Sequence, residues 1–262
     1  MKREQIKPEQ HAKKTVAKVE EAAHEAAHAA AAPPPVRRYR AVLFQLALLI
    51  ITAAFAVLTF LVKTTPSFPI DLQITRGIQQ INLPLFYELM IVVSWPGFGP
   101  QSFIIAALIV LMIYGFGLHW EAVAALIAAV FSTAVNVLVK DLIQRPRPTT
   151  AVVHVLDTLN SYSFPSGHVM FYLGFFGFIW FLAFSLLKPS TKRGLLLVFF
   201  GGLVLLIGIS RIYVGEHWAS DVLGSYLLGT LTLVAVIQFY RWGKTRFFVN
   251  QPVAAEAEPQ PA

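Results

Sequence analysis

The sequence predicts an all-α membrane protein, a bundle of six transmembrane helices with a disordered or partly helical N-terminal tail. Of its 262 residues, 56% are hydrophobic and only 13% are charged, and the mean hydropathy is +0.62. Soluble domains are about 45–50% apolar and about 25% charged. The composition therefore excludes an ordinary soluble domain. The absence of cysteine excludes disulfides, thiolate chemistry and zinc–cysteine sites.

Six apolar runs have roughly the 20 helical residues needed to cross a hydrocarbon core. They cover residues 41–62, 101–118, 121–139, 167–187, 194–212 and 222–240. A shorter apolar stretch, 85–95, has the length of an interfacial or re-entrant helix, and prolines and glycines interrupt the chain directly after it. The predicted membrane domain covers residues 37–246, between a low-complexity cytoplasmic tail, 1–36, and a disordered C-terminal tail, 247–262.

Basic residues flank alternate ends of these runs. They are Arg37, Arg38 and Arg40, then Lys188, Lys192 and Arg193, and finally Arg241, Lys244 and Arg246. With six spans, all three clusters fall on one side, which the positive-inside rule makes cytoplasmic. The sequence thus predicts a multi-pass protein of a plasma or inner membrane with both termini in the cytoplasm. The net charge of +7 reflects these topology signals and the site described next, so we expect no nucleic-acid partner.

Three polar stretches, 140–148, 163–168 and 210–221, are then expected to meet at the extracytoplasmic face. The first ends the third span, the second opens the fourth, and the third joins the fifth to the sixth. A charged side chain at the centre of a transmembrane helix costs about 2.5–3.5 kcal/mol. Several charges together are therefore expected in a cavity at the water interface.

Lys140, Arg147 and Arg211 bring three positive charges to this site from three segments. Arginine forks fit the oxygens of a tetrahedral oxyanion, and lysine adds a point charge. Each residue alone is typical of a side chain that snorkels to lipid headgroups, but three beside two histidines indicate an oxyanion site. Arg145 is interpreted as a loop or headgroup contact, and Trp218 as an aromatic anchor at the interface.

Ser166, Gly167 and His168 stand at the start of the fourth span. Serine is suited to the N-cap, glycine lets a ligand approach the backbone, and a helix start attracts an anion. His217 and Asp221 are one helical turn apart. A carboxylate there fixes the imidazole tautomer and leaves the other ring nitrogen as a nucleophile or base. Ordinary helix capping and an interfacial histidine remain the alternatives.

Together, the three stretches resemble the three-part signature of the type 2 phosphatidic acid phosphatase superfamily, which also contains soluble vanadium-dependent haloperoxidases. The matching residues are Lys140-x6-Arg147-Pro148, Pro165-Ser166-Gly167-His168 and Ser210-Arg211-x5-His217-x3-Asp221. The resemblance implies that His217 attacks phosphorus to give a phosphohistidine, that Asp221 orients it, and that His168 is the general acid and base. It also implies phosphate binding by Lys140, Arg147, Ser166, Gly167 and Arg211. Glu216 has no role in this interpretation.

The implied substrates are phosphorylated lipids of the bilayer, such as phosphatidic acid, phosphatidylglycerol phosphate, diacylglycerol pyrophosphate or undecaprenyl pyrophosphate. Because the cations supply the charge that a metal would bring, we expect a metal-independent enzyme without cofactors. Three alternatives remain: a lipid phosphotransferase with the same phosphohistidine, a transporter or channel with a basic vestibule, and a non-catalytic lipid-binding protein. Transfer of labelled phosphate to a lipid acceptor distinguishes the first, and polar residues continuing through the spans would favour the second.

Overall fold

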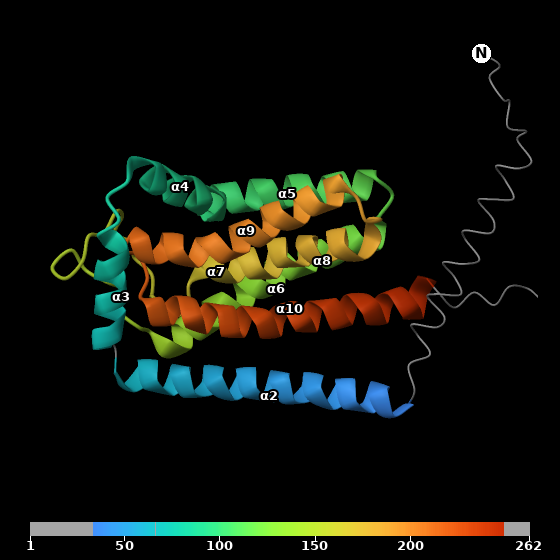
Figure 1. The fold of residues 1–262 in the computed structure, drawn as a ribbon, viewed down its shortest axis with the longest axis horizontal. Coiled ribbons are helices and arrows are strands. Elements are labelled where there is room, and N and C mark those ends of the chain that lie inside the picture. Colours follow the sequence, from blue (N-terminus) through green and yellow to red (C-terminus); the bar gives the residue numbers. More distant parts are fainter. Residues whose placement is uncertain (1–33, 66, 249–262) are drawn as a thin grey trace, which may run out of the picture. The chain divides into compact units, whose positions relative to one another are not determined.

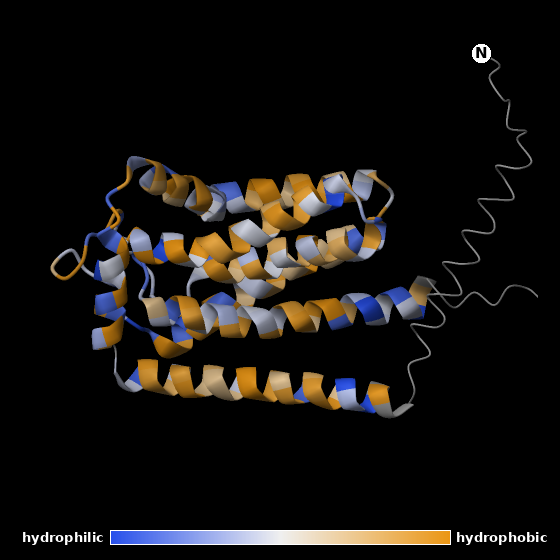
Figure 2. Ribbon diagram, in the orientation of Figure 1, coloured by the Kyte–Doolittle hydropathy of each residue, from blue (hydrophilic) through white to orange (hydrophobic). Residues whose placement is uncertain are grey.

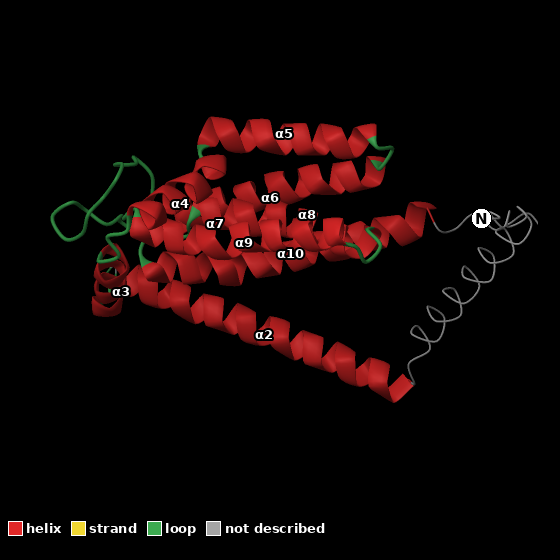
Figure 3. Ribbon diagram, turned by 45° about the horizontal axis from the view of Figure 1, so that its top comes forward, coloured by secondary structure: helices red, strands yellow, loops and turns green. Residues whose placement is uncertain are grey.

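The computed structural model describes residues 34–65 and 67–248, and within these ranges the chain forms helices joined by loops, without strands (Figure 3). The expectations for most of the N-terminal tail and for residues 249–262 lie outside the described residues. The chain divides into two compact units at residue 50, and the helix that crosses the boundary is continuous. The predicted all-α fold is confirmed.

The helices follow the predicted apolar runs closely (Figure 1). They are α2 (Pro34–Thr64), α3 (Pro69–Gln79), α4 (Pro84–Ser94), η1 (Trp95–Gly97), α5 (Gly99–Gly115), α6 (His119–Ile143), α7 (Gly167–Phe171), η2 (Tyr172–Phe176), α8 (Gly177–Leu186), α9 (Thr191–Tyr213) and α10 (Ala219–Phe248). Proline occupies a first-turn position in α3, α4 and α5, where its missing N–H has no helical partner to lose. The short helix α3 is an element that the apolar runs do not predict.

Five of the described helices are long and apolar enough to cross a membrane, and Figure 2 shows how hydrophobic residues dominate them. The segment from α4 through η1 joins α5 at a bend of 68°, and this pair makes a sixth span if it is counted as one. The bend falls at the proline and glycine cluster that follows the short apolar stretch. The predicted multi-pass architecture is confirmed.

The most buried span is the continuous run α7–η2–α8, which packs against α6, α9 and α10. Its interior face is aromatic, with Tyr172, Phe175, Phe176 and Phe178 buried. Gly174 lets this span approach α6, since a Cβ there would lie 1.8 Å from the side-chain oxygen of Ser132. This packing fixes the start of α7, where the predicted polar stretch lies.

The two ends of the bundle differ in chemistry. At one end lie α3, the 144–166 loop, the start of α7 and the α9–α10 link (Figure 1). At the other end, Glu121 of α6 accepts hydrogen bonds from Tyr240 (3.0 Å) and Lys244 of α10. Near the first end, Lys63 Nζ donates to the carbonyl oxygens of Leu142 and Ile143, both at 3.1 Å, which ties α2 to the end of α6.

Candidate active site

His217 and Asp221 form a buried pair where the α9–α10 link enters α10. His217 is 1% exposed and Asp221 is fully buried. Nδ1 of His217 lies 3.5 Å from Oδ2 of Asp221, which also accepts from the hydroxyl of Ser163 and, at 2.9 Å, from the backbone N–H of Trp218. The carboxylate therefore faces Nδ1, and Nε2 is the ring nitrogen that faces the cations of the site.

Arg147 lies directly against Nε2 of His217, with Nη1 at 3.3 Å. The same nitrogen donates to the carbonyl oxygen of Glu216 at 2.7 Å. Nε and Nη2 donate to the carbonyl oxygen and hydroxyl of Ser161, at 2.7 and 2.9 Å. These contacts hold the guanidinium beside Nε2 of His217.

Arg211 is completely buried at the end of α9. Its Nη1 donates to Ser94 Oγ at 2.8 Å, and its Nη2 forms an ion pair with Glu216. A buried guanidinium is tolerated when it is paired and hydrogen-bonded. Glu216, which has no role in the interpretation of the sequence, is thus the counterion of Arg211.

The start of α7 places a second histidine beside the site. Ser166 occupies the N-cap position, but its hydroxyl makes no capping hydrogen bond and lies buried without a partner, contrary to the expected side-chain cap. Its backbone N–H donates to Ser225 Oγ at 2.6 Å. Gly167 lies against Asn136, because a Cβ there would be 3.3 Å from the side-chain oxygen of Asn136. The Nε2 of His168 is buried without a hydrogen-bond partner, so it is available to a ligand.

A cavity of about 810 Å³ joins His168 and His217 to the space between α5 and α6, whereas Arg211 and Ser166 do not line it. His168, His217, Lys140 and Arg147 line its polar end, and Lys140 Nζ donates to the carbonyl oxygen of Tyr162. Its walls are apolar and include Phe103, Ala106, Ala107, Leu126, Ala129 and Val130. The cavity therefore suits a ligand with an anionic group and an apolar body.

The pKa of His217, which lies outside the spans, is held well below its ordinary value. Burial is the largest cause, and the cations Arg147, Lys140 and Arg211 add to it. Burial also lowers the pKa of Arg147, although Asp221 opposes the shift. His217 is accordingly neutral near pH 7, the state that a nucleophilic imidazole requires.

Arg145 differs most from its interpretation as a loop or headgroup contact, because its guanidinium is fully buried beneath the site. It pairs with Asp71 of α3 at 2.8 Å and with Asp221 at 2.6 Å. Trp218 is not an interfacial anchor either: it is 6% exposed and its Nε1 donates to the carbonyl oxygen of Pro146 at 3.2 Å. Arg145 stands directly before Pro146 at the end of an apolar run, a pattern typical of an exposed loop. No local pattern indicates that Asp71 is its partner.

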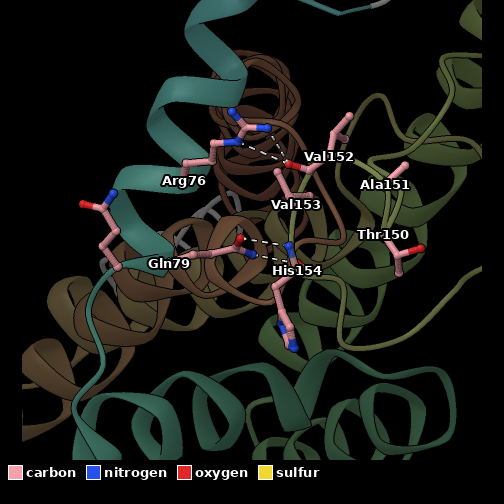
Figure 4. A pocket seen from close by; sticks show the side chains of 8 residues that line it. Arg76, Gln79, Thr150, Ala151, Val152, Val153 and His154 are labelled. Atoms are coloured by element: carbon pink, nitrogen blue, oxygen red, sulfur yellow. Dashed lines mark hydrogen bonds between the residues drawn. The ribbon is translucent and has the colours of Figure 1, made fainter.

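A separate open pocket lies where α3 meets the 144–166 loop (Figure 4). Arg76 donates to the carbonyl oxygen of Val152 at 3.3 and 3.1 Å. Gln79 donates to the carbonyl oxygen of His154 at 2.7 Å and accepts from its backbone N–H at 3.1 Å. None of the predicted site residues lines this pocket; its contacts fasten α3 to the loop.

Gly97 makes room for His168, and this close approach gives a testable prediction. A Cβ at Gly97 would lie 2.2 Å from Cδ2 of the imidazole. We expect Gly97→Ala to displace the ring and to lower kcat by about 10²-fold, as a displacement of about 1 Å at a reacting group does. Gly115→Ala, at the far end of α5 where a Cβ meets no atom within 4 Å, is the matched control. Equal activity of the two variants would contradict this prediction.

Fold and site together define a multi-pass membrane protein with two histidines and three cations, Lys140, Arg147 and Arg211, gathered at one end of its bundle. The model of the PAP2 superfamily matches residues 118–244. The chain is 29% identical over 192 residues to phosphatidylglycerophosphatase B of Bacillus subtilis, covering 71% of this chain and 90% of that protein. It is 35% identical over 132 residues to the undecaprenyl-diphosphatase BcrC of the same organism. This match covers 48% of this chain and 62% of that protein.

Solved structures agree with these matches. The transmembrane PAP2-type phosphatidylglycerolphosphate phosphatase of Bacillus subtilis superposes with a TM-score of 0.66 at 26% identity, covering 76% of this chain and 98% of that one. LpxE of Aquifex aeolicus shares the fold, with a TM-score of 0.54 at 22% identity over 66% of this chain and 98% of that one. Residues 118–244 thus match the PAP2 superfamily, and the fold of the transmembrane PAP2-type phosphatase agrees with that match.

Proposed function

We propose that this protein is an integral-membrane lipid phosphatase that hydrolyses phosphate monoesters or diphosphates of lipids through a phosphohistidine on His217. The observation that carries the proposal is the placement of that imidazole between Asp221, on the Nδ1 side, and Arg147, 3.3 Å from Nε2. The match to the PAP2 superfamily model, and relatives that are named phosphatases, support the assignment as a phosphoric ester hydrolase.

In the first step, Nε2 of His217 attacks phosphorus, the N–P bond forms and the bond from phosphorus to the lipid oxygen breaks. His168 donates a proton to that leaving oxygen. The positive charge that develops on the imidazole is stabilised by Asp221 through Nδ1. Arg147, Lys140 and Arg211, with Ser166 and the N–H of Gly167, bind the phosphoryl oxygens as negative charge develops.

In the second step, water attacks the phosphohistidine. His168, now neutral, accepts a proton from the water as the new P–O bond forms and the N–P bond breaks. Inorganic phosphate leaves, and both histidines return to their starting states. The cations that bind the phosphoryl group supply the positive charge of the site, which supports hydrolysis without a metal ion.

The cavity between α5 and α6 supports a lipid as the substrate. Its polar end holds His217 and His168, and its walls are apolar along both helices. A phosphorylated lipid has the same division between headgroup and tails. Two relatives carry the names phosphatidylglycerophosphatase and undecaprenyl-diphosphatase, so phosphatidylglycerol phosphate and undecaprenyl pyrophosphate are the first candidates, with phosphatidic acid as a third.

We place the site on the extracytoplasmic face and both termini of the 37–246 domain in the cytoplasm. His217 and Asp221 lie between the end of α9 and the start of α10, at one end of both helices. The clusters that begin at Lys188 and at Arg241 lie beside the opposite ends of these helices. The positive-inside rule assigns the basic end to the cytoplasm.

Phosphate release from purified full-length protein in detergent with EDTA tests this function. Phosphatidic acid, phosphatidylglycerol phosphate and undecaprenyl pyrophosphate are offered separately, with His217→Ala as the control. We expect release by the wild type from at least one lipid and none above background by the variant. Loss of activity with EDTA that an added divalent ion restores would contradict metal independence. Transfer of labelled phosphate to a lipid acceptor without release would instead establish a phosphotransferase.

A further inference from the structure

The oxygen of Asp221 that faces away from His217 is held by a second, deeper ion pair. Arg145 Nη1 donates to Oδ1 of Asp221 at 2.6 Å, while Arg145 Nη2 donates to Oδ2 of Asp71 at 2.8 Å. We infer that Asp71 and Arg145 are positioning residues that orient Asp221 for the attack by His217. This inference rests on the proposed function and extends the site to α3.

The network is closed by Ser220, the second residue of α10. Its backbone N–H donates to Oδ1 of Asp71 at 2.8 Å and its hydroxyl donates to Oδ2 at 2.6 Å. Arg145 Nη1 donates to the same hydroxyl oxygen at 2.7 Å. Asp71 therefore places a negative charge at the N-terminus of α10, where the helix dipole favours it. The carboxylate of one helix thus fixes the first turn of another, and that turn carries Asp221.

Charge explains why an aspartate is needed behind the arginine. Arg145 alone would neutralise Asp221 and weaken the carboxylate that must stabilise positive charge on His217. With Asp71 present, the buried group of two carboxylates and one guanidinium has a net charge of −1. All three side chains are at most 2% exposed, so water screens these charges little. The pair therefore holds Asp221 in place without cancelling its charge.

The attachment of α3 to the loop supports a fixed position for Asp71. Arg76 and Gln79, on the same helix, bind the backbone of Val152 and His154 (Figure 4). That loop also carries Arg145. Asp71 and Arg145 are thus both held in place by contacts of their own segments, as residues that orient Asp221 must be.

The pH profile of phosphate release provides a readout that a structural role would not change. His217 must be neutral to attack, so activity is lost as the pH falls through its pKa, which lies well below the ordinary value. The titratable and charged groups around it are Lys140, Arg147, His168, Arg211, Glu216 and Asp221. Removal of the charge on Asp71 disfavours the imidazolium and lowers this pKa further. The acidic limb of Asp71→Asn should then move to lower pH.

We expect Asp71→Asn to lower kcat by about 10- to 100-fold, with little change in KM because the contact acts on the reacting group rather than on ground-state binding. Arg145→Lys keeps the charge but cannot bridge two carboxylates. We expect it to lower kcat while its acidic limb stays near that of the wild type. Glu121→Gln, which removes an equally buried carboxylate at the other end of the bundle, is the control and should lower Tm alone.

The reaction of His217 with diethyl pyrocarbonate, followed by mass spectrometry over a pH series, tests the inference without turnover. The pH at which the reaction rate is half of its maximum reports the pKa of His217. This midpoint should fall in Asp71→Asn but not in Glu121→Gln. Wild type that releases no phosphate from any lipid would refute the proposed function, whereas this midpoint still measures the coupling. An unchanged midpoint together with an unchanged kcat in Asp71→Asn would overturn the inference.

Discussion

His217→Ala is expected to lower phosphate release by at least about 10⁴-fold, the usual scale for loss of a catalytic nucleophile. Nε2 of His217 is the ring nitrogen that lies against Arg147 at 3.3 Å. Alanine removes this nitrogen, which forms the covalent intermediate in the proposed mechanism. The measurement is the single-turnover rate with the lipid that the wild type hydrolyses fastest. The far-UV circular dichroism of the variant should be unchanged.

His154→Ala is the matched control, because that histidine is exposed and engages Gln79 through its backbone. It should retain wild-type activity.

In His168→Ala, a substrate with a good leaving group should form the phosphohistidine faster than water resolves it. Labelled phosphate should then accumulate on His217 as an acid-labile adduct. Labelling at any other residue would contradict the assignment of the nucleophile.

Arg147→Ala should reduce kcat by about 10²–10³-fold, the range for removal of one preorganised donor to a developing oxyanion. Its guanidinium lies against Nε2 of His217 and is held by Ser161 and Glu216. The variant also loses the cation beside His217, which raises the pKa of that histidine towards its ordinary value. The acidic limb of the pH profile should therefore move to higher pH, and kcat measured across that limb tests both effects.

Arg147→Lys separates charge from geometry at the same position. Lysine restores a cation, so the acidic limb should return towards that of the wild type, but a single ammonium cannot reproduce the guanidinium fork. Most of the loss in kcat should remain. Lys188→Ala removes an exposed cation at the other end of α9 and should change neither quantity. Full recovery by lysine would show that Arg147 acts only as a point charge.

The sequence predicts the parts of the site that depend on local spacing. His217 and Asp221 are one helical turn apart, and the structure places them 3.5 Å from each other. The apolar runs and the proline and glycine cluster before Gly99 likewise predict where the spans and their bend lie, because span length and helix breaking are local properties.

The deeper pairings could not be predicted in this way. Asp71 and Arg145 are separated by 74 positions, and only the packed tertiary structure brings them together. A lone arginine before proline at the end of a span is typical of a headgroup contact, so its burial had no local signal. The unpartnered hydroxyl of Ser166 is another such case, since helix-start chemistry predicts a cap that the backbone geometry does not form.

The contact between Asp71 and Ser220 also bears on how the protein is made. Its two partners are 149 positions apart in the chain. At about 5–20 residues per second, a ribosome needs roughly 7–30 s to synthesise the intervening segment. When that interval begins, α2 is the only described span already synthesised, and Asp221 and the helix that carries it are made only at its end. Asp71 therefore has no Ser220 or Asp221 beside it until the last span is synthesised, and the ion pairs around Asp221 can form only after that.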